Sequence, residues 1–378
     1  MAKKKICFVV AVPSTAQAFL KDHIEALSED YDVFIAGNIS SSDELTGLKV
    51  CSYQNIDIER EISIKNDLKA VSQLSSYFRK MKFDAIHSVT PKAGLVSALA
   101  GFLARIPVRI HIFTGQVWAT RKGFMRFILK SIDWLIAKLN THILVDGASQ
   151  CQFLIDEGVV SAKKAQVLGD GSIAGVNIQR FEPSEDTRKS VRQALNIADD
   201  KVVFVFMGRL NHDKGMYELL PAFDKLAATN KKGFLLLFGA DEENVAATFR
   251  IYKNLNEDNF LYYGMTKEPQ RMLQGGDVFV LPTYREGFGS SVIEAACLGL
   301  PTITSDAYGV LDASIPEETG LRCKVGDVDT LLACMNELAV AGEKRKKLGM
   351  AGRKRVLEKF AGSVVVRHWK HFYDTILR

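Results

Sequence analysis

The segment from Arg285 to Pro301, REGFGSSVIEAACLGLP, places two carboxylates eight positions apart around paired glycines and paired serines. The strand-like run DVFVLPT precedes it, and SSVIEAACLGLP predicts a helix that ends at Gly299 with a proline beyond it. A strand, a glycine-rich turn and a helix start together present free backbone amides, which bind phosphate. The residues expected to form this anion site are Gly287, Gly289, Ser290 and Ser291.

The two glutamates suggest what is attached to that phosphate. Glu294 lies about one turn inside the predicted helix, roughly 6 Å along the axis from its start. A ribose on the phosphate would be within its reach, and carboxylates accept well from paired hydroxyls. Glu286 lies on the turn and would face the group on the other side of the phosphate. If that group is a sugar, two carboxylates bind two sets of hydroxyls, with a diphosphate between them.

The elements that position these residues belong to a repeating pattern. In the first half, the apolar runs KICFVVAV, YDVFIAG, FDAIHSV, VRIHIFTG and THILVDG alternate with amphipathic stretches. The alternation restarts at KVVFVFMGRL and continues through GFLLLFGA, NFLYYGM and DVFVLPT. This pattern predicts two doubly wound, mostly parallel sheets in series, each with helices on both faces. Ligands bind at the carboxyl ends of such strands, so the chemistry is expected in a cleft between the two sheets.

The domain boundaries follow from the same pattern. A length of 378 residues exceeds the size at which one hydrophobic core stops growing, so two domains are expected. We predict an N-terminal domain over residues 1–175, a polar linker over 176–200 and a second domain over 201–360. A helix over 361–378 is expected to pack back on the first domain.

Three sequence segments together resemble the retaining glycosyltransferases of family 4, which have the GT-B fold. The first is Glu286-GFGSSVI-Glu294 followed by ACLGLP, which resembles that family's E-x7-E segment. The second is GRLNHDKG, in which Arg209 and Lys214 are five positions apart, and the third is LGDGSIAGVNIQRF. The resemblance covers residues 168–330 and implies an α/β GT-B fold with two Rossmann-like domains that face each other across a cleft.

The resemblance also implies roles for individual residues. Arg209 and Lys214 would bind the donor diphosphate without a metal, and no cofactor is expected. Glu286 would hold the hydroxyls of the donor sugar, helped by the backbone amides of Phe288 and Gly289, and Glu294 would hold the ribose. The run YGMT, which contains Met265, ends a strand where relatives bind the nucleobase. Uridine is preferred to guanosine on base rate alone.

The first domain departs from the family pattern. Relatives often carry a glycine pair in the first loop and a histidine after the strand that corresponds to VRIHIF, whereas this chain has PSTAQ and FTGQ there. His111 could reach the reacting centre or could be a buried core histidine. Thr114, Gln116 and His87 are acceptor-side candidates, and turn chemistry is an equal alternative for His87.

The stretch VWATRKGFMRFILKSIDWLIAKLN interleaves cations with large apolar side chains, which suits an anionic membrane surface. We therefore expect residues 118–139 to contact lipid, with Trp118 and Phe124 facing the membrane. The alternative is an ordinary amphipathic helix packed on the sheet.

Bulk composition narrows the function further. The net charge of +5 falls short of the basic footprint of nucleic-acid-binding proteins. The six cysteines lack metal-ligand spacing, so no metal site is expected. The N-terminal apolar run is short and interrupted by Pro13, which favours a first strand over a secretory signal. A cytoplasmic protein, peripheral at the inner face of the cell membrane, is expected.

These observations predict a retaining glycosyltransferase that moves a sugar from a nucleotide diphosphate sugar, with UDP preferred, to a hydroxyl. The expected acceptor is a lipid-linked saccharide in surface polysaccharide or lipopolysaccharide biosynthesis. The alternatives are a sugar-nucleotide epimerase or phosphorylase of GT-B shape and a non-catalytic adaptor at the membrane.

Overall fold

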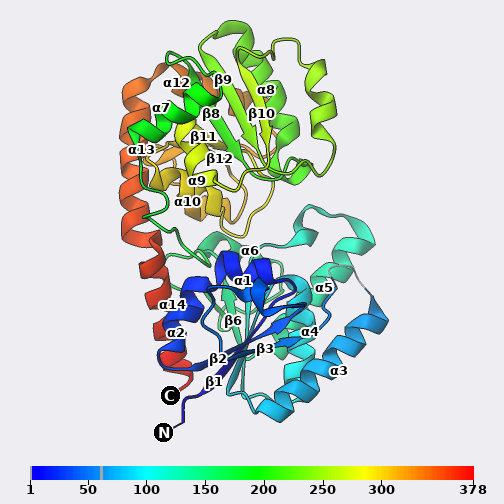
Figure 1. Cartoon of the computed structure of the whole chain (residues 1–378). Coiled ribbons are helices and arrows are strands. Elements are labelled where there is room, and N and C mark those ends of the chain that lie inside the picture. Colours follow the sequence, from blue (N-terminus) through cyan, green and yellow to red (C-terminus); the bar gives the residue numbers. More distant parts are fainter. Residues whose placement is uncertain (1, 60–62) are drawn as a thin grey trace. The chain divides into compact units, whose positions relative to one another are not determined.

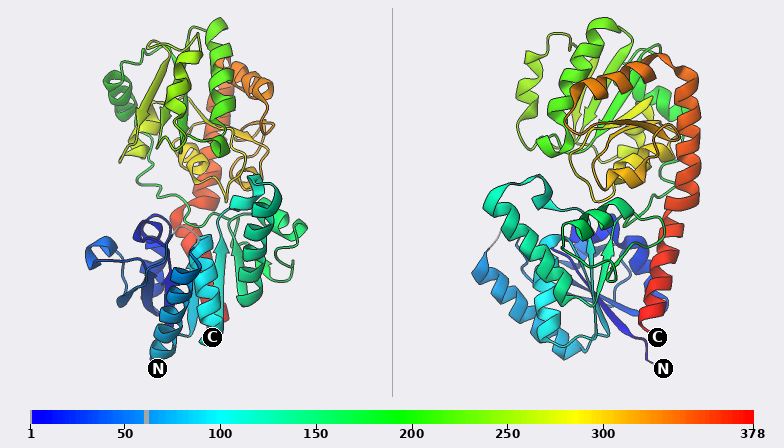
Figure 2. Two further views of the ribbon diagram at one scale, coloured as in Figure 1. Left: turned by 90° about the vertical axis from the view of Figure 1, so that its right-hand side faces the viewer. Right: turned by 180° about the vertical axis from the view of Figure 1, so that it is seen from behind.

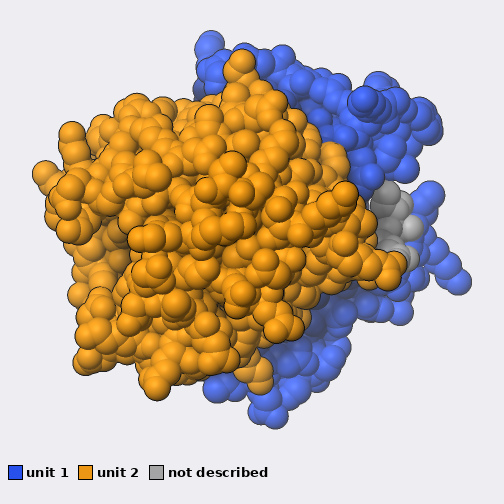
Figure 3. Space-filling model, turned by 90° about the horizontal axis from the view of Figure 1, so that it is seen from above, with its two compact units in different colours: residues 1–174, 362–378 blue, residues 175–361 orange. Residues whose placement is uncertain are grey.

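The computed structural model describes residues 2–59 and 63–378. The chain divides into two compact units, one formed by Met1–Ala174 with Gly362–Arg378 and the other by Gly175–Ala361 (Figure 3). Each unit is an α/β domain built on one parallel sheet (Figure 1).

The sheet of the first unit has seven parallel strands in the order β3-β2-β1-β4-β5-β6-β7. Its strands are β1 Lys5–Val9, β2 Asp32–Gly37, β3 Ser52–Asn55, β4 Ala85–Val89, β5 Val108–Phe113, β6 His142–Val145 and β7 Ala165–Gln166. Its helices are α1 Pro13–Phe19, α2 Lys21–Ser28, α3 Ile64–Met81, α4 Pro91–Leu103, α5 Gly123–Leu139, α6 Ala148–Asp156 and α14 Gly362–Ile376, with 3-10 turns η1 Ser42–Leu45 and η2 Val117–Thr120.

Strand β1 shows why helices cover both faces of this sheet, as Figure 2 shows. Ile6 and Phe8 are buried in a cluster with side chains of α2 and α14, whereas Cys7 and Val9 are buried in a cluster with side chains of α3 and α4. Successive side chains of a strand point to opposite faces, so a continuous apolar run requires cover on both sides.

Helix α14 joins the first unit although it lies at the end of the sequence. The ring of Trp369 is buried and stacks on two buried histidines, with ring centroids 3.9 Å from His23 and 5.0 Å from His87. The hydroxyl of Tyr373, also on α14, lies 2.7 Å from Nδ1 of His87. These contacts bind the C-terminal helix to the core of the first unit.

The sheet of the second unit has six parallel strands in the order β10-β9-β8-β11-β12-β13. Its strands are β8 Val202–Met207, β9 Gly233–Phe238, β10 Phe260–Gly264, β11 Val278–Leu281, β12 Thr302–Ser305 and β13 Gly320–Cys323. Its helices are α7 Glu185–Ala194, α8 Met216–Thr229, α9 Pro269–Met272, α10 Ser290–Cys297, α11 Val310–Ala313, α12 Val328–Val340 and α13 Gly342–Arg355, with shorter turns η3 His212–Lys214, η4 Val245–Ile251, η5 Leu273–Gly275 and η6 Val356–Phe360.

The segment 176–200, expected to be a linker, belongs to the second unit and contains α7. Arg188 and Arg192 form ion pairs with Asp277, at 2.6 and 2.5 Å. Arg192 is only 3% exposed and also donates to the carbonyl of Gly275. These two arginines anchor the segment to the second unit, while many of its other polar residues are exposed.

Candidate active site

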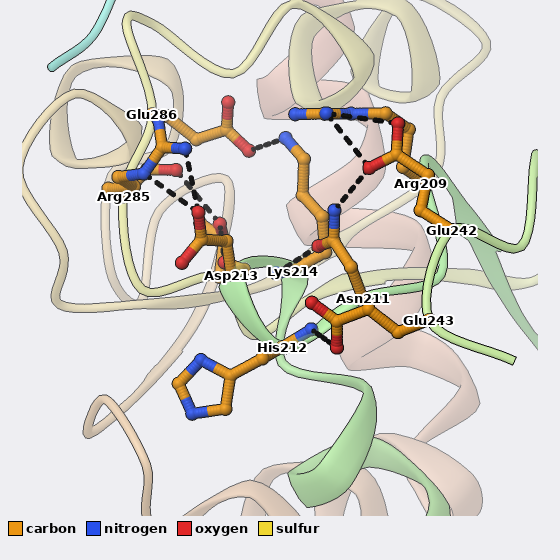
Figure 4. Close-up of polar contacts among 10 residues, drawn as sticks. Arg209, Asn211, His212, Asp213, Lys214, Glu242, Glu243, Arg285 and Glu286 are labelled. Atoms are coloured by element: carbon orange, nitrogen blue, oxygen red, sulfur yellow. Dashed lines mark hydrogen bonds and ion pairs between the residues drawn. The ribbon is translucent and has the colours of Figure 1, made fainter. Parts of the chain in front are cut away.

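The carboxyl ends of β8 and β11 are adjacent, and the strand order of the second sheet reverses between them. In open α/β sheets, ligands bind at this switch point. The loop after β8 carries Arg209 and Lys214, and the loop after β11 carries Glu286. The fold thus brings three predicted donor-site residues to one edge of one sheet (Figure 4).

A glycine allows the two loops to touch. Gly215 has a φ of +74°, and a Cβ atom there would lie 2.0 Å from the carbonyl oxygen of Pro282. A side chain at this position would force the loops apart, so the close approach requires glycine.

Lys214 and Glu286 form a direct ion pair between the two loops (Figure 4). Their side chains are only 17% and 14% exposed. A second pair lies beside it, in which Arg285 donates to Oδ2 of Asp213 from Nε at 2.9 Å and from Nη2 at 2.6 Å. The hydroxyl of Thr283 donates to the carbonyl of Asp213 at 2.8 Å, which fixes the turn that presents Lys214.

Arg209 lies on the same loop and pairs with Glu242, which follows β9. Its Nη1 atom donates to both carboxylate oxygens, at 3.2 and 3.0 Å. Asn211 donates to Glu242 from its amide nitrogen at 2.9 Å, while its amide oxygen accepts from the backbone of Lys214 at 3.1 Å. Glu242 and Asn211 were not among the predicted site residues, although the acidic run DEEN directly after the strand-like run GFLLLFGA was a signal.

Helix α10 begins as the sequence predicts, at Ser290, with Gly289 before it at a φ of +88°. No side chain caps this helix start, so its first amides remain available to an anion. Gly287 and Phe288 are buried, and the ring of Phe288 packs 5.1 Å from that of Phe360. Only the backbone of Phe288 is therefore suited to ligand contact. Ser290 and Ser291 are partly exposed.

Glu294 lies on α10 with its carboxylate in a desolvated position. Burial raises its pKa to about 7, and the positive charge of Arg180 opposes that rise. A carboxylate in this state is stabilised in its ionised form by hydroxyl donors, which a ribose would supply. Met265 follows β10 and is 77% exposed, which leaves its side chain free for contact with a ligand.

The predicted residues of the first unit are mostly core residues. His111 is 1% exposed, with Nδ1 2.9 Å from the hydroxyl of Ser88, and burial lowers its pKa to about 3. Its ring lies where a Cβ on Gly94 would be, 2.5 Å from Cε1. His87 is fully buried between β4 and α14, as described above. This placement favours the core alternative for His111 and a packing role for His87.

Gln116 and Thr114 lie in the loop after β5. Thr114 is partly exposed, whereas Gln116 is fully buried and accepts from Nε2 of Gln150 at 3.2 Å. Its own Nε2 has no partner among the described residues. The two residues therefore share a loop, but only Thr114 reaches the surface.

The expectation that Trp118 faces a membrane is wrong. Its side chain is 1% exposed, and Nε1 donates to Oδ2 of Asp133 at 2.7 Å. Arg126 and Lys130 lie over the Trp118 ring and form ion pairs with Glu157. Their charges are therefore engaged within the first unit. The amphipathic pattern did not reveal that Asp133 on α5 would accept a hydrogen bond from the indole.

Other apolar side chains of this stretch are exposed. Phe124, Phe127 and Trp134 lie on α5 at spacings of three and seven residues, and are 75%, 67% and 45% exposed. The ammonium of Lys138 lies 4.7 Å from the Trp134 ring centre. Within residues 2–59 and 63–378, no helix is long and apolar enough to cross a bilayer. The same residues contain no cluster of three or more His, Cys, Asp or Glu side chains that could hold a metal.

Comparisons with known proteins agree with this architecture. The family model described as glycosyl transferases group 1 matches residues 187–355. The capsular polysaccharide biosynthesis glycosyltransferase CapM of Staphylococcus aureus is 30% identical, with 100% of this chain and 99% of that protein covered. The N,N'-diacetylbacillosaminyl-diphospho-undecaprenol alpha-1,3-N-acetylgalactosaminyltransferase of Campylobacter jejuni is 25% identical, with 99% of each covered. The crystal structure of Anabaena HepE in complex with UDP has a TM-score of 0.80 at 17% identity, over 98% of this chain and 100% of that one.

Two parallel, doubly wound domains with a polar cluster at the switch point of the second are the architecture of GT-B proteins. The chain belongs to the glycosyl transferases group 1 family. It is a glycosyltransferase with relatives in polysaccharide biosynthesis.

Proposed function

We propose that the protein is a retaining glycosyltransferase of family 4 that uses a nucleotide diphosphate sugar, with UDP as the preferred nucleotide. The observation that carries this proposal is the group formed by Arg209, Lys214 and Glu286 at the ends of β8 and β11, beside the uncapped start of α10. Cations and amides on one side suit a diphosphate, and a carboxylate beside them suits sugar hydroxyls.

In this proposal the diphosphate binds Arg209, Lys214 and the amides of Gly289, Ser290 and Ser291. Each cation attracts a phosphate charge by about 4 kcal/mol at 4 Å and an effective dielectric of 20, before desolvation is subtracted. Glu286 and the Phe288 amide bind the sugar, Glu294 binds the ribose, and the base lies near Met265. The cations stabilise the charge that develops on the leaving group, so no metal is required.

The proposed reaction is a displacement on the face from which the diphosphate leaves. The bond between the anomeric carbon and the diphosphate oxygen breaks, and the acceptor oxygen forms the new bond on that face. The acceptor proton passes to the leaving phosphate oxygen. Activity is therefore expected to survive a metal chelator, and loss of activity that added metal restores would contradict this part of the proposal.

For the acceptor we propose a lipid-linked saccharide, bound by the first unit with a contact from Thr114. The name of the Campylobacter jejuni relative describes transfer to a diphospho-undecaprenol-linked sugar, and an Escherichia coli relative is named as a galactosyltransferase on a similar lipid. We further propose a cytoplasmic protein that contacts the inner face of the membrane through α5. The exposed Phe124, Phe127 and Trp134 side chains support this proposal.

Thermal melting with UDP, GDP and a panel of their sugar conjugates tests the proposal. A ligand that binds only the folded protein raises the melting temperature, and Arg209→Ala or Lys214→Ala is expected to abolish that rise. An unchanged melting temperature with every nucleotide would contradict the donor site and favour a non-catalytic adaptor. Conversion of the sugar nucleotide without any acceptor would instead identify an epimerase.

A further inference from the structure

Glu242 holds two side chains of the proposed diphosphate-binding loop at once. It accepts from Nη1 of Arg209 and from the amide of Asn211, and Asn211 in turn accepts from the backbone of Lys214 (Figure 4). Through these bonds Glu242 fixes one of the proposed diphosphate cations directly, and through Asn211 it also braces the turn that carries the other.

The backbone holds Glu242 in this position. Gly239 directly follows β9 and has a φ of +145°, and a Cβ there would lie 1.7 Å from the carbonyl oxygen of Gly208. The two loops therefore touch, and Leu210 forms a β-bridge with Asp241. The Asp241 carboxylate accepts from the backbone amides of Val245 and Ala246, at 2.8 and 2.9 Å, which fixes the loop after β9.

The geometry of the guanidinium separates two possible roles for Glu242. A carboxylate that covered the whole fork of Arg209 would compete with phosphate. Glu242 contacts Nη1 only, and among the described residues Nε and Nη2 make no hydrogen bond. A guanidinium has five N–H donors in a rigid fork, so the remaining edge can still bind phosphate in a bidentate manner.

Stability does not account for this contact. The side chains of Arg209 and Glu242 are 47% and 40% exposed, and an ion pair at such exposure adds little to folding stability. An arginine that must present one edge to a ligand, however, gains from a partner that fixes its rotation, because ordering the side chain on binding costs affinity.

We propose that Glu242 is a positioning residue for the donor diphosphate, which orients Arg209 so that its free edge faces the phosphate. This inference rests on the proposed donor site. It assigns no direct substrate contact to Glu242.

The test measures UDP and GDP affinity by calorimetry for the wild type, Glu242→Ala, Glu242→Gln, Arg209→Ala and the double variant Arg209→Ala/Glu242→Ala. Glu242→Ala is expected to weaken binding of the preferred nucleotide about tenfold, because small losses of orientation are costly to a site. Glu242→Gln keeps one acceptor oxygen, so its nucleotide affinity is expected to lie between those of the wild type and Glu242→Ala. The double variant is expected to bind no more weakly than Arg209→Ala, since Glu242 acts through Arg209.

Asp329→Ala is the matched control, because Asp329 forms another exposed ion pair of the second unit, with Lys225 at 2.7 Å. It is expected to leave nucleotide affinity unchanged. Tighter binding by either Glu242 variant would show that Glu242 competes with phosphate, and additive losses in the double variant would show that it acts independently of Arg209. Either result overturns the inference and leaves the donor site standing. A wild type that binds neither nucleotide overturns both.

Discussion

The Lys214 ammonium and the Glu286 carboxylate are paired with each other across the loops after β8 and β11. Each is proposed to bind a different part of the donor, so the donor must separate them. Their pairing compensates two largely buried charges, because an unpaired buried charge is costly.

This pairing predicts that Glu286→Gln has opposite effects on nucleotide affinity and on the rate of sugar transfer. Without the competing carboxylate, Lys214 should bind a nucleoside diphosphate at least as tightly as the wild type does. Sugar transfer should fall roughly tenfold or more, since hydrogen bonds to a charged group contribute about 1.5–3 kcal/mol. Calorimetry with UDP and steady-state rates with the donor would measure the two effects. Weaker UDP binding by this variant would contradict the exchange of partners.

The exposed side chains of Phe124, Phe127 and Trp134 on α5 predict which surface of the protein binds a membrane. Phe124→Ala with Phe127→Ala should reduce co-sedimentation with anionic vesicles and change the free energy of unfolding by less than about 0.5 kcal/mol, as for surface positions. Trp118→Ala should instead destabilise the first unit by about 3–5 kcal/mol, because it empties a core position. Equal vesicle binding by the wild type and the double variant would rule out this surface.

The two histidines around Trp369 predict a loss of stability in acid. Burial lowers the pKa of His23 to about 4 and holds that of His87 well below its usual value. The unfolded chain binds these protons near the ordinary histidine pKa, so stability is full above it and falls as the pH drops. For His23 the loss is about 3 kcal/mol, complete near the folded-state pKa.

Tryptophan fluorescence measures this loss selectively, because all three tryptophans lie in the first unit. Urea unfolding at a series of pH values should give a free energy that declines with acidity. His23→Gln should flatten part of that decline. A stability that is constant from neutral pH to the folded pKa of His23 would contradict the packing role of these rings.

Glu294 predicts the opposite dependence in the second unit. Its pKa is raised from the ordinary glutamate range to about 7, so its contribution to stability is full in acid and is lost as the pH rises through that interval. Glu294→Gln should therefore be more stable than the wild type above this interval, by about 1–3 kcal/mol after allowance for partial exposure.

The same carboxylate should report ribose binding. Ribose hydroxyls favour the ionised form, so UDP should release more protons from the wild type near neutral pH than from Glu294→Gln, in which only the phosphate itself can lose protons. Calorimetry in buffers of different ionisation enthalpy measures this release. Equal proton release by the wild type and Glu294→Gln would place the ribose away from Glu294.

Most of the fold could be predicted from the spacing of apolar residues. Buried parallel strands are short continuous apolar runs, whereas in helices the apolar residues recur about every 3.6 positions. Helix α3 spans the predicted stretch IKNDLKAVSQLSSYFRKM from end to end, as Ile64–Met81. The expected strands correspond to β1, β2, β4, β5, β6, β8, β9, β10 and β11. Strands β3, β7, β12 and β13 were missed; β3 escaped because SYQN is polar and its residues are mostly exposed.

Contacts that join distant segments were not predictable. Glu242 lies beside Arg209 only because β9 pairs with β8, and Arg188 reaches Asp277 only because α7 packs on the second unit. No local pattern encodes these pairings.

The sequence by itself determined the class of fold and the order along the chain of the segments that form the candidate donor site, because periodicity and turn chemistry are local properties. The tertiary structure decided which side chains face inward and which charges are paired. Trp118 and Phe124 both lie in a stretch of mixed apolar and basic residues, yet Trp118 is buried and donates to Asp133, whereas Phe124 is 75% exposed. Burial depends on partners that folding brings from elsewhere in the chain, and the free energy of desolvating a polar group is set by those partners.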